Sequence, residues 1–188
     1  MLATVGAVAV LVSACGVSFT DGTGTAEPTP GSAAPTLPPQ PREIDLTGVD
    51  TCTLLTSEQQ RQLGTDTLPD PSVETDRYGN TYCDYGKNLS SPRFGYQLKV
   101  VTQEDAAVYL TNERNAVARV VSAAGFPAVE ARPPGDKRGC FIFVSTKDGQ
   151  YLSVQYGEST GSDDTTEAAC EKVRVAAELA MQTLLTQR

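Results

Sequence analysis

The sequence contains no histidine and no tryptophan, and its 15 lysines and arginines are outnumbered by 23 aspartates and glutamates, which leaves a net charge of −8 at pH 7. The absence of histidine excludes Ser-His-Asp and Cys-His catalytic centres and every metal site that needs an imidazole ligand. The acidic balance argues against nucleic acid as a partner and against docking on anionic lipid through basic residues, because both need a surplus of lysine and arginine.

Motifs that signal catalysis or a cofactor are also scarce. There is no Ser-x-x-Lys dyad and no EF-hand loop, and Gly22-x-Gly24 has no strand before it, so it is not a dinucleotide-binding loop. The sequence therefore predicts no catalytic residue, no metal site and no cofactor, and we expect a protein that is not an enzyme.

A long apolar run occurs only at the N-terminus, in residues 2–12, where nine of eleven residues are alanine, valine or leucine. A helix of that length spans about 16 Å, well short of the ~30 Å hydrocarbon core of a membrane. The run ends in Val12-Ser13-Ala14-Cys15, which fits the bacterial lipobox. We expect residues 1–14 to be a lipoprotein signal peptide and Cys15 to carry lipid (including palmitate), which places the protein on the outer face of the cell membrane.

Two points stand against that interpretation. A buried N-terminal strand or helix with an incidental cysteine would give the same pattern. Signal peptides also open with lysine or arginine, whereas the first charged side chain here is Asp21. We therefore expect the natural start to lie upstream of Met1, or the chain to be trimmed.

Residues 15–43 are predicted to be a lipid-anchored cysteine followed by a disordered tether. Six of the twelve prolines lie between Thr23 and Pro41, and large apolar side chains are almost missing there. Such a segment buries too little surface to offset the entropy of ordering it. As a coil it reaches roughly 30 Å, which suits a domain held off a membrane.

Residues 44–188 are predicted to be a single α+β domain, with a mainly antiparallel sheet of four to five strands, helices packed on one face and two disulfides. Asp148-Gly149 predicts a type I′ hairpin turn. The Thr56/Gln59 capping box and Gly64 delimit the first helix, and an apolar stripe at intervals of three and four marks the last. The predicted helices are 50–64, 102–115 and 163–186, and the predicted strands are 81–85, 93–101, 117–122, 140–146 and 151–156.

Four cysteines remain after Cys15, an even number that predicts two disulfides in an exported protein. We favour Cys52–Cys83 and Cys140–Cys170, because each pair would join the start of a helix to a strand. The nested pairing of Cys52 with Cys170 and Cys83 with Cys140 stays open. A four-cysteine zinc site is disfavoured, because such sites use closely spaced pairs and the nearest cysteines here are about thirty residues apart.

Several segments together resemble a family of small exported actinobacterial lipoproteins whose domain has no known function (the DUF3558 type). The segments are the lipobox, the Pro/Thr tether, Cys52-Thr-Leu-Leu-Thr56, Gly139-Cys140-Phe-Ile-Phe-Val144 and Ala169-Cys170-Glu171. The resemblance implies an uncharacterised envelope protein with two disulfides, and it implies no catalytic residue.

Two further sets of residues are candidates for a site. Glu104-Asp105, and Asp163-Asp164 with Glu158 and Glu167, are carboxylate clusters that suit calcium or acid–base work, although capping of helices is the simpler role. The second set could floor a carbohydrate or lipid groove, although core packing is the simpler role. That set consists of the aromatic residues Tyr78, Tyr82, Tyr85, Phe94 and Tyr96.

We expect a monomeric, non-catalytic envelope module that is held to the membrane through Cys15 and binds an unknown envelope protein or small ligand, without nucleic acid. The alternative is a hydrolase of cell-wall polymer that works through carboxylates, since glycoside hydrolysis needs no histidine.

Lipidation of Cys15 can be checked by mass spectrometry of the membrane fraction. The expected mass is that of a chain beginning at Cys15 with lipid attached, because the lipobox directs both modification and cleavage. Recovery from cells of an unmodified chain running from Met1 to Arg188 would contradict the prediction.

Overall fold

The computed structural model describes residues 36–72, 75–136, 139–160 and 165–188, and the account below concerns these residues. The α-helices are α1 (Ser57–Leu63) and α2 (Thr166–Gln187), and the 3₁₀ segments are η1 (Thr51–Thr53), η2 (Ala106–Leu110) and η3 (Asn112–Arg114). The strands are β1 (Asp70–Pro71), β2 (Tyr82–Lys87), β3 (Arg93–Val101), β4 (Val117–Ala123), β5 (Phe126–Arg132), β6 (Gly139–Lys147) and β7 (Gln150–Thr160).

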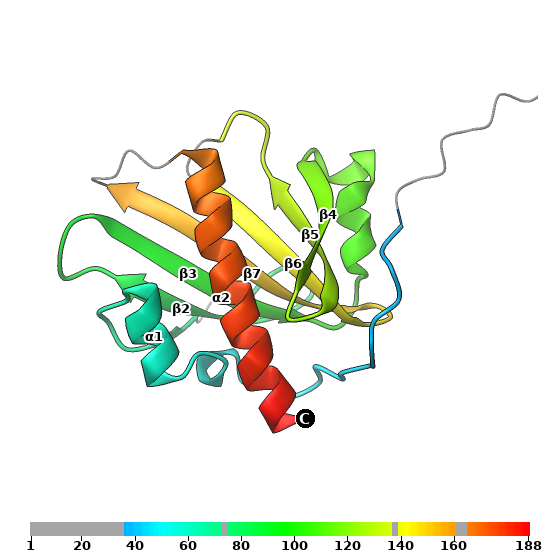
Figure 1. Cartoon of the computed structure of the whole chain (residues 1–188), viewed down its shortest axis with the longest axis horizontal. Coiled ribbons are helices and arrows are strands. Elements are labelled where there is room, and N and C mark those ends of the chain that lie inside the picture. The colour runs from blue at the N-terminus through cyan, green and yellow to red at the C-terminus, as the bar shows by residue number, and fades with distance from the viewer. Residues whose placement is uncertain (1–35, 73–74, 137–138, 161–164) are drawn as a thin grey trace, which may run out of the picture. The chain divides into compact units, whose positions relative to one another are not determined.

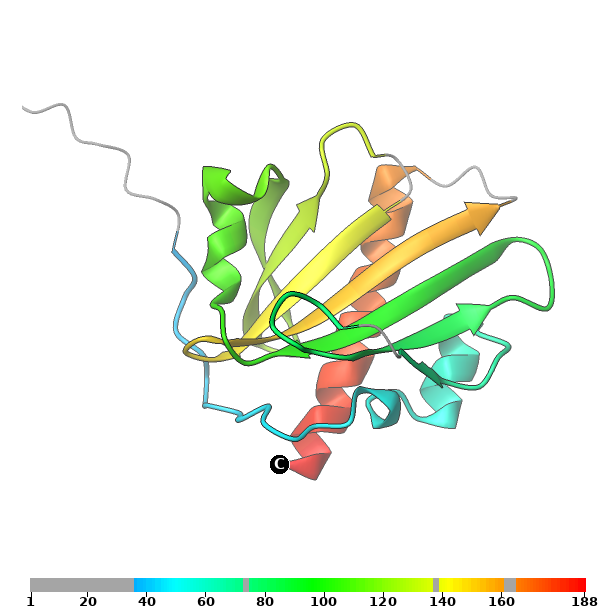
Figure 2. The same ribbon diagram turned by 180° about the vertical axis from the view of Figure 1, so that it is seen from behind.

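All seven strands form one antiparallel sheet in the order β1-β2-β3-β7-β6-β5-β4. The last strand of the chain, β7, lies between β3 and β6 and so joins the N-terminal and C-terminal hairpins into a single sheet. Helix α2 crosses one face of the sheet diagonally (Figure 1), and the opposite face of β2, β3, β7 and β6 carries no α-helix (Figure 2).

The prediction of an α+β domain with four to five strands is wrong, because the fold is dominated by a seven-stranded sheet with two α-helices in the described residues. The prediction missed β1 and β5. In β5, Pro127 and Glu130 both argue against a central strand. Pro127, however, precedes Ala128, the first residue of β5 that pairs with β6, so its missing N–H leaves no bond of that ladder unmade.

The prediction that helices pack on one face is also wrong. Residues 102–115 form η2 and η3 instead of one helix, and η2 lies on the face opposite α2, where Ala106 is buried. Thr111 causes the break: its hydroxyl donates to the Val108 carbonyl at 2.7 Å and accepts from the Glu113 N–H at 3.3 Å. Local bonds of this kind compete with a continuous helix.

The first predicted helix, 50–64, is too long at its start, because η1 occupies Thr51–Thr53 and α1 begins only at Ser57. The Thr56/Gln59 capping box forms as predicted, and Gly64 ends α1 in the left-handed region with φ 74°. Helix α2 buries one stripe against β6 and β7 and thereby closes the main core. The stripe consists of Ala169, Val173, Ala176, Ala180 and Leu184.

The β6–β7 turn differs from the prediction. Of its two central residues only Gly149 has a positive φ, so the turn is not type I′, and the register shifts between Ser145 and Lys147. Both central residues have positive φ in the β4–β5 turn, at Ala124 (48°) and Gly125 (81°). That turn therefore supplies the twist that a tight hairpin needs.

Two disulfides are present, as predicted, and they join the favoured pairs. Cys52–Cys83 ties η1 to β2, and Cys140–Cys170 ties β6 to α2. Each bond closes a loop of about thirty residues. By lowering the entropy of the unfolded chain, each such loop stabilises the folded state by about 3–4 kcal/mol.

The last residues of the predicted tether contact the sheet. Leu37 packs against the smaller apolar cluster on the face opposite α2. The Gln40 amide donates to the Ser145 hydroxyl at 2.7 Å. Directly after the tether, the Ile44 N–H donates to the Thr146 carbonyl at 2.8 Å. Cys15 and most of the tether lie outside the described residues.

Tyr85 makes the fold less stable at alkaline pH. Its ring is buried, its hydroxyl donates to the Thr51 carbonyl at 2.7 Å, and burial raises its pKa to about 12. In the unfolded chain the Tyr85 hydroxyl ionises near pH 10, so below that pH it does not change the free energy of unfolding. As the pH rises from 10 toward 12, the free energy of unfolding falls by about 2–3 kcal/mol in all. The free energy of unfolding, measured with denaturant below and above pH 10, should fall less in Tyr85→Phe than in the unmodified protein. An equal fall in both proteins would contradict this role.

Candidate binding groove

The pairing register decides which side chains occupy the face opposite α2. Gln97 of β3, Gln155 of β7 and Phe141 of β6 are neighbours across the strands, and Lys99, Ser153 and Phe143 form the next row. Residues two apart on a strand point to the same side, so both rows lie on one face. This face is the one toward the viewer in Figure 2.

Three aromatic rings form a platform on this face. Tyr109 of η2 stacks on Phe143 with ring centroids 3.6 Å apart and an interplanar angle of 9°. Phe141 lies beside Phe143, with centroids 5.8 Å apart and planes 12° apart. Phe143 is only 4% exposed, whereas Phe141 is half-buried. The platform therefore has one covered position and one accessible position.

Around this platform the surface is hollowed into a groove of about 310 Å³. Its floor comes from β3, β7, β6 and β5, and the segment from η2 to the start of β4 forms one wall. Two cationic side chains face it, Lys99 and Arg114, and none of its lining residues is an acid. Arg132 touches its edge, but this residue alternates with Ala131 and its side chain pairs with Glu167 of α2 on the other face. The groove thus joins an apolar ring surface to positive charge in a protein of net charge −8.

Glu104 fixes the wall of the groove. Its side chain, only 11% exposed, accepts hydrogen bonds from the guanidinium groups of Arg77 and Arg114 and from the Tyr151 hydroxyl at 3.0 Å. Burial, followed by the hydrogen bond with Tyr109, raises the pKa of Tyr151, so this hydroxyl remains a donor. The result is that Arg114 is held 5.6 Å from the centre of the Tyr109 ring.

A second hollow, of about 450 Å³, continues the groove and shares Gln97 and Gln155 with it. Its floor includes Gly95 and Gly157, which are register partners one row beyond the two glutamines. A Cβ added at Gly157 would meet no atom within 4 Å, so the fold does not require glycine there for space. The open face is therefore a trough that extends beyond the aromatic platform.

Three acids line the second hollow, namely the candidate Glu158 of β7 and the pair formed by Asp70 and Asp84. Asp70 and Asp84 are direct register partners on β1 and β2. Burial raises the pKa of Asp84, as does the charge of Asp70, and this outweighs the opposing effect of the hydrogen bond from Gln97. A raised carboxyl pKa beside a second carboxylate is the arrangement that acid–base chemistry uses.

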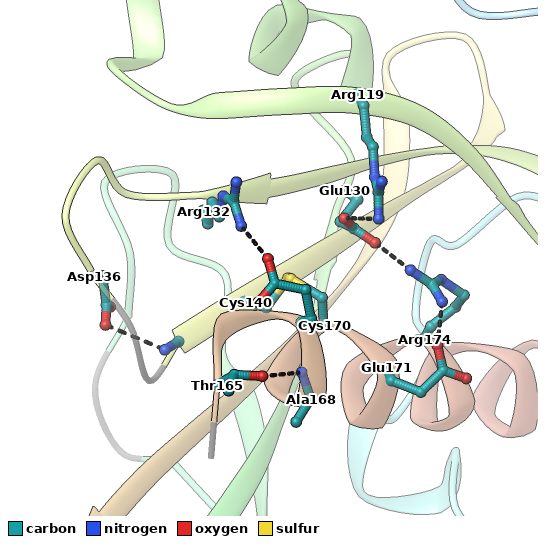
Figure 3. The surroundings of a disulfide bond; sticks show 12 residues. Arg119, Glu130, Arg132, Asp136, Cys140, Thr165, Ala168, Cys170, Glu171 and Arg174 are labelled. Carbon is teal, nitrogen blue, oxygen red and sulfur yellow. Dashed lines mark hydrogen bonds and ion pairs between the residues drawn. A yellow bond between two sulfur atoms is a disulfide. The ribbon is translucent and has the colours of Figure 1, made fainter. Parts of the chain in front are cut away.

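The α2 face holds a buried carboxylate beside the Cys140–Cys170 disulfide (Figure 3). Glu130 is 7% exposed and forms ion pairs with Arg119 and Arg174, each at 2.7 Å. The hydrogen bond to Glu130 is the main reason that the pKa of Arg174 is raised. Glu130 lies close to both sulfur atoms, but a disulfide sulfur is no thiolate ligand, so this cluster is structural.

The candidate carboxylates from the sequence do not meet in one site. Asp105 accepts from the Ala107 N–H at 2.8 Å and caps η2, as the simpler interpretation expected. Glu104 instead organises the groove wall. Glu167 lies in the first turn of α2 and pairs with Arg132 at 3.6 Å. Asp163 and Asp164 lie outside the described residues.

None of the aromatic residues singled out from the sequence lines the groove around the platform, although Tyr85 and Phe94 line the second hollow. Tyr85 and Tyr96 are buried in the core, and Phe94 packs against it. The groove uses Tyr109, Phe141 and Phe143 instead. The signal for the last two was in the predicted strand 140–146, where alternation places both on one face.

Residues 157–161 read Gly-Glu-Ser-Thr-Gly, which fits the Gly-x-Ser-x-Gly pattern of hydrolase nucleophile elbows. That motif places its serine on a turn between a strand and a helix and uses a histidine base. Ser159 lies within β7, and the chain has no histidine. The match is therefore not a catalytic elbow.

In the described part of the chain, neither α-helix has both the length and the apolar character that a membrane crossing requires. Comparison with curated proteins and with solved structures gave no match. A family model described as "Protein of unknown function (DUF3558)" matches residues 10–183, which is nearly the whole chain. The chain therefore belongs to the DUF3558 family of proteins of unknown function.

Proposed function

We propose that this protein is an exported lipoprotein, anchored through Cys15 to the outer face of the cell membrane, that binds a ligand without catalysing a reaction. The single observation that carries the binding role is the groove opposite α2, where an accessible aromatic ring lies beside two cations, Lys99 and Arg114, and no acid. Small-molecule sites commonly combine an apolar surface with a few convergent polar groups in this way.

The anchor and the groove are connected through the end of the tether. The lipobox and the proline-rich segment motivate the anchor. Leu37, where the described chain begins to contact the domain, packs against the same apolar cluster that includes Phe143 and Ala131 of the groove. A tether that ends beside the groove supports the view that anchoring and binding serve one function.

Photocrosslinking in cells that produce the lipidated chain tests the binding role even while the ligand is unidentified. Benzoylphenylalanine replaces Phe141 in one variant and Val175 in a control. Val175 is 37% exposed on α2, on the opposite face. We expect a defined adduct from position 141 only, because ligand-bearing grooves exclude water and hold their occupant close. Identical adducts from both positions, or none from either, would contradict a binding groove.

The Asp70–Asp84 pair favours the alternative function, a carboxylate hydrolase of cell-wall polymer, because its geometry and the raised pKa of Asp84 suit general acid catalysis. Asp84→Asn separates the two functions. A hydrolase would release new reducing ends from purified wall glycan and lose about 100-fold or more of that rate in the variant. We expect no release by either protein. Measurable release by the unmodified chain, abolished by the substitution, would replace the binding role with the hydrolytic one.

A further inference from the structure

We propose that β4 is a dimerisation strand, which pairs with β4 of a second copy of this chain and so continues the sheet from one molecule into the next. This inference goes beyond the proposed function, because it concerns an edge of the sheet and not the groove. It replaces the expectation of a monomer. Three features of the fold support the pairing: the open edge, the outward-facing backbone groups of β4 and the side chains that would meet.

The two edges of the sheet differ in how their backbone groups are bonded. Beyond β2, the segment 66–72 covers the edge. The Asp66 N–H donates to the Gly86 carbonyl at 2.9 Å. The Ser72 N–H donates to the Tyr82 carbonyl, also at 2.9 Å. At the other end of the sheet (Figure 1), no backbone group of the described residues other than those of β5 bonds to β4.

Strand β4 also lacks the devices that keep an edge from pairing. Proteins protect such edges with proline, lysine or a bulge. The sequence of β4 is VARVVSA, without proline or lysine, and its pairing with β5 has no register shift. Two of its valines are open to solvent, since Val117 is 51% exposed and Val120 is 40% exposed. An edge of this kind is ready to accept a further strand.

The hairpin turn determines which backbone groups of β4 face outward. The turn between β4 and β5 has two residues, so the flanking Ala123 and Phe126 make the first bonded pair. Bonded and non-bonded pairs then alternate along the antiparallel ladder. The backbone groups that point away from β5 are therefore those of Ala118, Val120 and Ser122.

These three residues lie symmetrically about Val120. With a twofold axis beside it, Val120 faces Val120 of the partner, and Ala118 faces Ser122 of the partner on either side. Every group in these pairs points outward, so each pair can exchange two N–H···O bonds. Moving the axis to residue 119 or 121 would leave one of the three without a strand partner. An interface with this symmetry closes at two copies.

The side chains that would meet are compatible. Val120 would lie against its own copy in an apolar contact. Arg119, the one charged residue of β4, would face Val121 of the partner. Within its own copy Arg119 already forms an ion pair with Glu130 at 2.7 Å. No like charges are therefore directly opposite each other, the arrangement that destabilises cross-strand pairs.

A pairing of one strand with one strand is a small interface, so the dimer should be weak in dilute solution. Two chains that are tethered to the same membrane are confined together, and tethering can raise the local concentration to about the millimolar range. The proposed lipid anchor therefore suits a dimer of this kind.

Engineered cysteines test the register in the whole chain carrying Cys15→Ser, which removes the free thiol. Val120→Cys places a cysteine opposite its own copy, at a Cα–Cα distance of about 5.5 Å that a disulfide can span. The matched control Val117→Cys is on the same strand and more exposed, but it would face Ala123 of the partner, about 20 Å from its own copy. With mild oxidation at up to about 1 mM, we expect at least about tenfold more covalent dimer from position 120 than from position 117.

A charge on the axis tests the same register without a crosslink. Val120→Lys would place two lysines opposite each other, whereas Val117→Lys adds the same charge facing Ala123 of the partner. Both positions are exposed, so neither lysine should disturb the fold, which circular dichroism would verify. Sedimentation velocity should show a dimer that grows with concentration for Cys15→Ser alone and with Val117→Lys. With Val120→Lys the dissociation constant should rise about tenfold or more.

The results support or overturn the β4 dimer without reference to the groove. A covalent dimer that forms from position 120 and not from position 117, together with dissociation by Val120→Lys alone, would support it. Equal crosslinking at both positions would overturn it. So would a Cys15→Ser chain that remains a monomer at about 1 mM, or a dimer that Val120→Lys leaves intact. The groove is judged separately, by photocrosslinking at position 141.

Discussion

One helix cannot cover both faces of this sheet, and the rest of the structure depends on that limit. Helix α2 has 22 residues, about 33 Å of length, and is about 10 Å wide. Seven strands at about 4.8 Å spacing make a sheet nearly 30 Å across with two faces to cover. The chain buries the α2 face with alanine, valine and leucine and leaves most of the other face to polar and aromatic residues. The groove is the consequence.

Charge is arranged around two partly buried acids. Glu104 on the open face and Glu130 on the α2 face each form ion pairs with two arginines. In a chain with 23 acids, such pairing places arginines at chosen positions without leaving a buried charge unpaired. Glu104 thereby holds η2 and Arg114 at the groove. The two arginines paired with Glu130 allow this charged residue to lie in the middle of β5.

Some of this could be predicted from the sequence, and the reason in each case is local. Alternation in 93–101 predicts the bounds of β3, and the Thr56/Gln59 capping box forms as predicted although the helix was expected from residue 50, because the determining contacts lie within a few residues. Strand β5 could not be predicted in this way, since Glu130 needs Arg119 and Arg174 from distant segments. The groove likewise depends on register: Gln97, Gln155 and Phe141 are far apart in sequence and meet only after β7 inserts between β3 and β6.

The junction between the tether and β6 has a mechanical consequence. The Ile44 N–H is bonded to the carbonyl of Thr146 near one end of β6, and Cys140 near the other end is covalently joined to α2. Tension along the N-terminal segment would load β6 first, in the interior of the sheet and flanked by β5 and β7. The covalent link to α2 would then share that load with the main core, so the domain is built to resist tension applied at its N-terminal end.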